Sequence, residues 1–128
     1  MLFRSKDKRE IHNLVVDSGL DFIASRMIGT SYSVMSHMAV GDDGTTPLAG
    51  DTALGSELAR QALTSSTVLN NVVTYVASFG AGIGTGALEE AGIFNAGSGG
   101  DMLCRTTFAV VNKGASDGMT ITWTVTAG

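Results

Sequence analysis

Residues 119–126 alternate strictly between two kinds of side chain. One parity is threonine throughout, and the other is apolar, with Met119, Ile121, Trp123 and Val125. A period of two residues over this length is typical of a β-strand that buries one face and exposes the other. Because such a strand is stable only beside other strands and over a core, this feature commits the chain to a sheet.

Earlier segments carry a similar strand signature. They are rich in β-branched and aromatic residues, and turns containing Gly, Asn and Asp separate them. No helical segment of crossover length lies between the later ones, which favours antiparallel pairing. The sequence therefore predicts a mostly β fold, a single antiparallel β-sandwich or small barrel. The predicted strands are residues 33–40, 59–70, 72–79, 102–111 and 119–126.

Residues 33–40 differ from the other predicted strands because both of their faces are apolar. This pattern is typical of a central or covered strand. Residues 41–51 follow and gather Gly, Asp, Thr and the one proline, a composition that predicts a loop.

One N-terminal helix is predicted between residues 17 and 29. Four residues with helical spacing form one stripe, and they are Leu20, Ile23, Ala24 and Met27. Asp17 or Ser18 can cap the N-terminus, and Gly29 can adopt the left-handed conformation that ends a helix. We expect the stripe to face the core. The expected core residues are Leu20, Ile23, Met27, Phe79, Phe108, Ile121 and Trp123.

Length and composition indicate one domain that folds without disulfide bonds or metal ions. A chain of 128 residues can bury enough surface to fold alone. Cys104 is the one cysteine, so neither an internal disulfide nor a cysteine-based zinc site is expected. We find no signal peptide and no apolar run long enough for a membrane span, so we expect synthesis in a cytosol-like compartment and no membrane partner.

Charge is distributed unevenly along the chain. Residues 1–10 hold four basic against two acidic residues, a balance of +2, and the rest holds four basic against ten acidic residues, a balance of −6. Residues 1–10 are therefore a basic arm, which is either a solvated terminus or a contact with an acidic partner surface. We expect no nucleic-acid binding, because the domain formed by residues 11–128 is acidic.

The glycine-rich residues 80–86 do not form a nucleotide-binding motif. They read G-x-G-x-G-x-G rather than G-x-G-x-x-G, and the phosphate loop G-x-x-x-x-G-K-[ST] is absent from the sequence. We interpret residues 80–86 as a flexible hairpin or a contact loop.

Acidic and histidine side chains show no catalytic or metal-binding spacing. His12 and His37 belong to no metal motif, and we expect His37 to be packed or interfacial. Asp42 and Asp43 are interpreted as turn-forming residues, since calcium-loop spacing is missing. Adjacent residues of a strand point to opposite faces, so the pair Glu89 and Glu90 is interpreted as interface or turn charges.

Cys104 is the remaining candidate for chemistry. Arg105 beside it could lower the pKa of the thiol, but alternation places Cys104 with Phe108 on one face, which favours packing in the core. The nucleophile motif G-x-S-x-G does not occur. We expect no enzyme, no catalytic residue, no cofactor and no metal. An enzyme would require a concave pocket that holds titratable groups with shifted pKa values.

Two blocks of sequence resemble a known group of proteins. Residues 38–60 read MAVGDDGTTPLAGDTALGSELAR, and residues 90–125 contain EAGIFNAGSGGDMLCRTTF and close on ITWTV. In these motifs the chain is similar to small virion structural proteins of tailed bacteriophages. That group includes head decoration (cement) proteins and attachment domains of tail-collar or tail-fibre proteins. The resemblance implies assembly, a mostly β fold and no catalytic activity.

The resemblance also implies a place in the virion. A fibre protein would normally continue into a shaft, so we expect a decoration protein on the capsid surface that binds the major capsid protein and stabilises the head. The alternative is a tail-collar or tail-fibre adaptor that binds tail or collar proteins. A homo-oligomer is implied, with a trimer favoured. The expected capsid contacts are Leu2, Phe3, Arg4, Lys6, Lys8 and Arg9.

Overall fold

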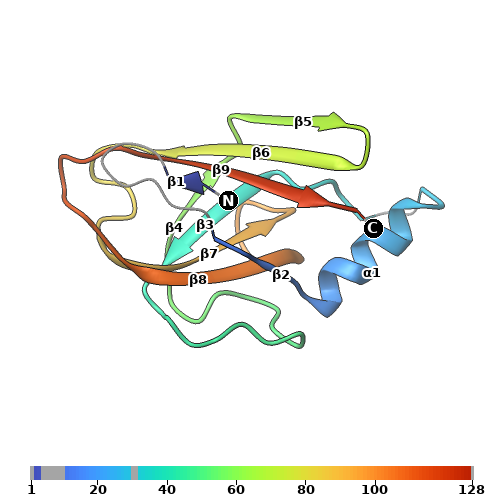
Figure 1. The fold of residues 1–128 in the computed structure, drawn as a ribbon, viewed down its shortest axis with the longest axis horizontal. Coiled ribbons are helices and arrows are strands. Elements are labelled where there is room, and N and C mark those ends of the chain that lie inside the picture. Colours follow the sequence, from blue (N-terminus) through green and yellow to red (C-terminus); the bar gives the residue numbers. More distant parts are fainter. Residues whose placement is uncertain (1, 4–10, 30–31, 128) are drawn as a thin grey trace.

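Two antiparallel sheets and one helix make up the computed structural model, which describes residues 2–3, 11–29 and 32–127 (Figure 1). The sheets pack face to face around a shared core. The predicted mostly β sandwich with one N-terminal helix is confirmed.

The first sheet contains the clearest predicted strand. Trp123 of its strand β9 lies opposite Tyr75 of β6, and the predicted strands 72–79 and 119–126 match the structure residue for residue. In β9 the apolar parity is buried or half-buried, and the threonine parity faces outward. The strand order is β1-β9-β6-β5, with β1 at Leu2–Phe3, β9 at Met119–Thr126, β6 at Val72–Phe79 and β5 at Ser65–Leu69.

The second sheet has β3 in its interior. β3 pairs with β7 on one side and β4 on the other, which confirms the central position, although the strand begins at His37 rather than at residue 33. The strand order is β2-β8-β7-β3-β4, with β2 at Leu14–Val15, β8 at Met102–Lys113, β7 at Gly86–Phe94, β3 at His37–Gly41 and β4 at Glu57–Ala62.

The prediction of one strand over residues 59–70 is wrong, because the chain changes sheets in its middle. Leu63 N donates to Ser36 O on the side of the second sheet, and Thr64 N donates to Val76 O of the first. Two successive N–H groups therefore bond to different sheets. β4 ends before this crossing and β5 begins after it.

The glycine-rich residues 80–86 form a second crossing, not a hairpin, because β6 and β7 belong to different sheets. Gly82 and Gly84 have φ angles of 77° and 68°, which favour glycine. A Cβ on Gly84 would lie 3.0 Å from Cγ2 of Val40. These glycines thus allow a tight turn close to the core.

The core between the sheets contains most of the expected strand residues. Phe79, Ile121 and Trp123 are fully buried, as predicted, and Phe108 is half-buried at the margin. Cys104 is also fully buried, which confirms its packing role.

Helix α1, Asp17–Arg26, packs with a different face from the one predicted. Gly19 and Phe22 are its buried residues. The expected core residues Leu20, Ile23 and Met27 are exposed, at 54%, 38% and 82%. The reason is close approach, because a Cβ on Gly19 would overlap the carbonyl oxygen of Leu103 in β8. The glycine face can lie against the sheet, and the larger apolar stripe faces away.

Both predicted ends of the helix need adjustment. Val16 occupies the N-cap without a side-chain hydrogen bond, so the proposed capping by Asp17 or Ser18 is wrong. The hydroxyl of Ser18 instead donates to Met102 O at 2.7 Å, which fastens the helix to β8. The helix ends at Arg26, and Gly29 adopts the expected left-handed conformation, with φ of 68°, after a further turn.

Candidate functional site

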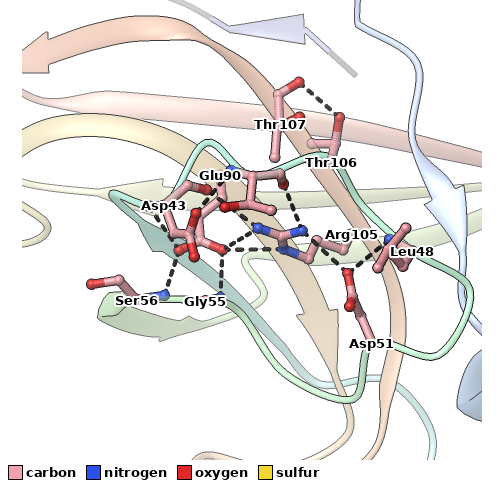
Figure 2. A network of polar contacts seen from close by, with 10 residues as sticks. Asp43, Leu48, Asp51, Gly55, Ser56, Glu90, Arg105, Thr106 and Thr107 are labelled. Carbon is pink, nitrogen blue, oxygen red and sulfur yellow. Dashed lines mark hydrogen bonds and ion pairs between the residues drawn. The ribbon is translucent and has the colours of Figure 1, made fainter.

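A buried ion pair lies beneath the long loop that joins β3 to β4, residues 42–56 (Figure 2). Glu90 comes from β7 and Arg105 from the adjacent strand β8. Glu90 is 0% exposed and Arg105 is 3% exposed. The Nη2 and Nε atoms of Arg105 donate to Oε1 of Glu90 at 3.0 and 3.1 Å. We call this pair and its loop contacts the loop-anchoring network.

Backbone N–H groups of the loop donate further hydrogen bonds to the Glu90 carboxylate. Oε2 accepts from Ser56 N at 2.7 Å and from Asp43 N at 3.1 Å, and Oε1 accepts from Gly55 N at 2.8 Å. Burying a carboxylate is costly unless it is paired and hydrogen-bonded, and both conditions are met here. The interpretation of Glu90 as an interface or turn charge is therefore wrong, because it anchors the loop inside the molecule.

A β-bulge explains why strand alternation misled the prediction for Glu89 and Glu90. The register of β7 against β8 shifts between Leu88 and Glu90. Leu88 consequently lies in the main core, whereas Glu90, of the same parity, lies under the loop. A Cβ on Gly44 of this loop would lie 2.7 Å from Oε1 of Glu89. Both carboxylates lie against the loop, not on opposite faces as expected.

The guanidinium of Arg105 joins separate points of the loop. Its Nη1 atom donates to Thr45 O at 3.0 Å and to Oδ2 of Asp51 at 3.2 Å, and Nη2 donates to Asp43 O at 3.3 Å. Asp51 also accepts from Leu48 N. Arg105 thus points toward the loop. Burial raises the pKa of the neighbouring Cys104 thiol, so the thiol is not activated.

Asp43 plays the predicted turn-forming role. Its Oδ1 accepts from Thr45 N at 2.8 Å. A hydrogen bond from the Thr45 side chain, with smaller contributions from this backbone bond and from Arg105, holds the pKa of the Asp43 carboxyl below its usual range. Within residues 2–3, 11–29 and 32–127, no group of three or more His, Cys, Asp or Glu side chains could hold a metal ion.

The loop covers a second apolar cluster on the outer face of the second sheet. Leu54 of the loop packs there with Val16, Ala39, Phe94 and Met102. This explains the apolar pattern on both faces of β3, because Met38 and Val40 lie in the main core while Ala39 lies under the loop. The loop-anchoring network therefore keeps a cover over an otherwise exposed apolar surface.

Two further cations hold other loops. The Cζ atom of Arg60 lies 3.8 Å from the ring centroid of Phe94, and its Nη1 atom donates to Ala96 O and Gly99 O. Lys113 donates from Nζ to Gly80 O at 2.8 Å and Asp117 O at 2.7 Å. The fourth basic residue beyond residue 10, Arg26, donates to Tyr32 O. Every basic residue of the domain thus binds within the chain.

The histidines lie on separate elements. His12 is exposed, and its carbonyl oxygen accepts from the hydroxyl of Thr106. His37 is half-buried in β3, with Nδ1 at 2.7 Å from the hydroxyl of Ser36. This environment agrees with a packed His37.

An apolar groove of about 330 Å³ lies between α1, the segment before β3, and the β5–β6 hairpin. We call it the β5 groove. No charged side chain lines it, and burial raises the pKa of Tyr75, its one ionisable group. Its lining residues are Phe22, Val34, Met35, Ser66, Thr67, Val68, Val73 and Tyr75. The sequence reasoning missed this groove because it assigned the wrong helix face to the core.

The expected capsid contacts are only partly described. Leu2 and Phe3 form β1 and pair with Thr122 and Ile121 of β9. The other expected contacts, Arg4, Lys6, Lys8 and Arg9, lie outside the described residues. Their predicted role stays a prediction.

The sequence contains an indication of the loop-anchoring network that the alternation of side chains along the strands did not reveal. Residues 90–94 and 102–108 each place one charged residue, Glu90 or Arg105, within an apolar strand. Opposite charges within two apolar strands indicate a buried pair when the strands are adjacent, but adjacency comes from the fold.

Fold and site together define an antiparallel β-sandwich whose loops are fastened by internal cations. No family model, no curated protein and no solved structure matches this chain. Among the described residues, no helix has the length and apolar character needed to cross a membrane.

Proposed function

We propose that this chain is a non-enzymatic virion structural protein that decorates a capsid by binding the major capsid protein. One observation carries the proposal: the two blocks that resemble phage virion proteins meet in the loop-anchoring network. Residues 38–60 supply the loop with Asp43, Gly55 and Ser56, and residues 90–125 supply Glu90 and Arg105. The resembling segments are thus two halves of one structural unit.

The chemistry of the network supports a structural role. Both oxygens of Glu90 are occupied by N–H donors, and Arg105 is bonded to the loop and to Glu90. Neither group is available to transfer a proton or bind a substrate without dismantling the loop. A loop held in this way can present a fixed surface to a lattice.

The basic arm is proposed as the electrostatic contact with the capsid. The basic residues beyond residue 10 bind within the chain, which leaves the acidic residues to dominate the charge of the domain. Residues 1–10 carry the opposite charge, +2 against −6. An acidic capsid surface would attract the arm while repelling the domain, so the arm sets the orientation of binding.

Particles stripped of the protein provide the test of this contact. We expect full-length protein to restore occupancy at low salt and to lose it as salt rises, because screening acts over about 8 Å at physiological ionic strength. A variant that lacks residues 2–9 should bind less at low salt and show a weaker salt dependence. Equal occupancy of the two proteins at every salt concentration would refute the arm contact.

The alternative site is the tail, where the same resemblance would make the chain a tail-collar or tail-fibre adaptor. An electron-microscopy map of the intact particle separates the two. A decoration protein occupies many symmetry-related positions on the head, with trimers favoured, whereas an adaptor occupies a few positions at the tail. Density at the tail alone would contradict capsid decoration.

A further inference from the structure

Strand β5 is an open edge of the first sheet (Figure 1). It pairs with β6 on one side, and no described strand pairs with its other side. All of its residues are exposed, and its last two, Val68 and Leu69, are 69% and 76% exposed. An edge of this kind presents a row of N–H and C=O groups to which another strand can bind.

β5 lacks the features that usually protect such an edge. Natural proteins place charged side chains, proline or bulges there to prevent pairing. Residues 61–88 contain no Asp, Glu, Lys, Arg or Pro. The register of β5 against β6 runs from Ser65 to Leu69 without a shift, so no bulge interrupts it. The edge is therefore neutral, regular and open to another strand.

The β5 groove lies beside this edge and adds an apolar surface. Ser66, Thr67 and Val68 of β5 line it, together with Val73 and Tyr75 of β6. A strand edge next to an apolar groove is the arrangement by which β-strand addition works, because the backbone supplies affinity and the groove accepts alternate side chains.

We propose that β5 pairs antiparallel with β5 of a second copy of this chain, about a twofold axis at Thr67. Charge favours a second copy as the occupant. The whole chain carries a net charge of −4, so two copies repel one another over most of their surfaces. The uncharged residues 61–88 let two copies meet without that repulsion. In a twofold contact the same surface of both copies takes part, so each favourable interaction occurs twice.

The twofold axis fixes which residues meet. Thr67 lies opposite Thr67 of the second copy, Ser66 opposite Val68, and Ser65 opposite Leu69. Val68 of each copy then lies beside the groove of the other, because Ser66 and Val68 both line it. Pairing covers the exposed valines and joins the two first sheets into one continuous sheet.

The expected dimer is weak. A pair of five-residue strands buries less than the 1,200 to 2,000 Å² of a standard interface, so we expect a Kd on the order of 0.1 to 1 mM. Such a contact forms where copies are held at high local concentration. It uses only the β5 edge, so it is independent of the proposed virion function and of a threefold contact elsewhere.

Charge reversal at the axis tests the pairing. Thr67→Lys puts two ammonium groups directly opposite one another, and Thr67→Glu does the same with two carboxylates, so each variant alone should be monomeric. A mixture of the two variants places opposite charges at the axis and should associate about two- to thirtyfold more tightly than either alone. Sedimentation equilibrium at low salt, up to about 1 mM protein, measures this range of Kd.

Thr74→Lys is the matched control. Thr74 lies opposite Thr67 on the same outer face, but it belongs to β6, which has neighbours on both sides. We expect this variant to dimerise like the wild type. Wild-type protein that stays monomeric over the whole range would overturn the proposal. So would equal loss of dimer in Thr74→Lys and Thr67→Lys, or a mixture that associates no better than its components.

Discussion

Glu90 illustrates how a buried charge can be stable in a small β-sandwich. The carboxylate loses water on burial, a cost of several kcal/mol per ion, and regains five N–H donors from the loop and Arg105. Three of these donors are backbone N–H groups of the loop, so the Glu90 carboxylate has its full set of hydrogen bonds only when the loop is closed over it. Glu90 therefore makes closure of the loop part of the folding transition.

Glu90→Gln should lower the free energy of unfolding by about 3 to 5 kcal/mol, because it removes the buried carboxylate that pairs with Arg105, leaves only the partly exposed Asp51 as a counter-ion, and turns an amide NH₂ toward backbone donors. Asp51→Asn is the control. Asp51 also contacts Arg105, but it is 25% exposed, so we expect a cost of about 1 kcal/mol or less. Urea denaturation measures both. Similar small losses in the two variants would show that the buried pair is not the anchor.

Ionisation of the buried Cys104 thiol should lower the stability of the protein at alkaline pH. Burial raises its pKa above the ordinary value of 9.0, so the native state holds this proton more tightly than the unfolded chain does. The stability from the neutral thiol is fully present below pH 9.0 and is lost as the pH rises above it, by up to about 1.4 kcal/mol per pH unit.

Cys104→Ala should therefore weaken the alkaline decline of stability, although its cavity lowers stability at every pH. Tyr75, whose pKa burial also raises, is present in both proteins. The comparison is between slopes of unfolding free energy against pH, from about pH 9 to 11. Parallel slopes for the two proteins would contradict a contribution from the thiol.

At the scale of elements, two strands could be predicted residue for residue from the sequence, whereas the break between β4 and β5, strand β7 and the buried face of the helix could not. Alternation is a local property of an extended backbone, so residues 72–79 and 119–126 could be recognised as strands from the sequence alone. The buried face of α1 depends on the approach of Gly19 to Leu103, which local spacing does not encode. Glu90 likewise meets loop residues 34 to 47 positions away, and no local pattern specifies that distance.

Gly19→Ala tests whether close approach decides the helix face. In an exposed helix interior this change would gain about 1 kcal/mol, but here the new Cβ overlaps the Leu103 carbonyl oxygen, so we expect a loss of stability. Gly50→Ala, at a loop glycine with no atom within 4 Å of the added Cβ, should be nearly neutral. Thermal unfolding of both variants checks the order. A stabilising Gly19→Ala would mean that the helix is not held so closely against β8.

At the scale of the whole molecule, the chain interleaves its two sheets. β3 and β4 belong to the second sheet, β5 and β6 to the first, β7 and β8 to the second, and β9 to the first. Each sheet thus depends on strands that are separated in sequence by strands of the other. Neither sheet can complete its pairing before the chain has crossed between them, and the two share one core.

This interleaving predicts one cooperative unfolding transition and slow folding, in milliseconds to seconds, as for other β-sandwiches with mostly non-local contacts. The chain supplies one native probe for each sheet, the single tryptophan Trp123 in β9 and the single cysteine Cys104 in β8. In urea, Trp123 fluorescence and the reactivity of the Cys104 thiol should change at the same midpoint, and far-UV circular dichroism should agree with both. Exposure of Cys104 at a lower urea concentration than the change at Trp123 would show that the second sheet opens separately. The shared core argues against that outcome, because opening one sheet exposes the buried face of the other at the same cost in apolar surface.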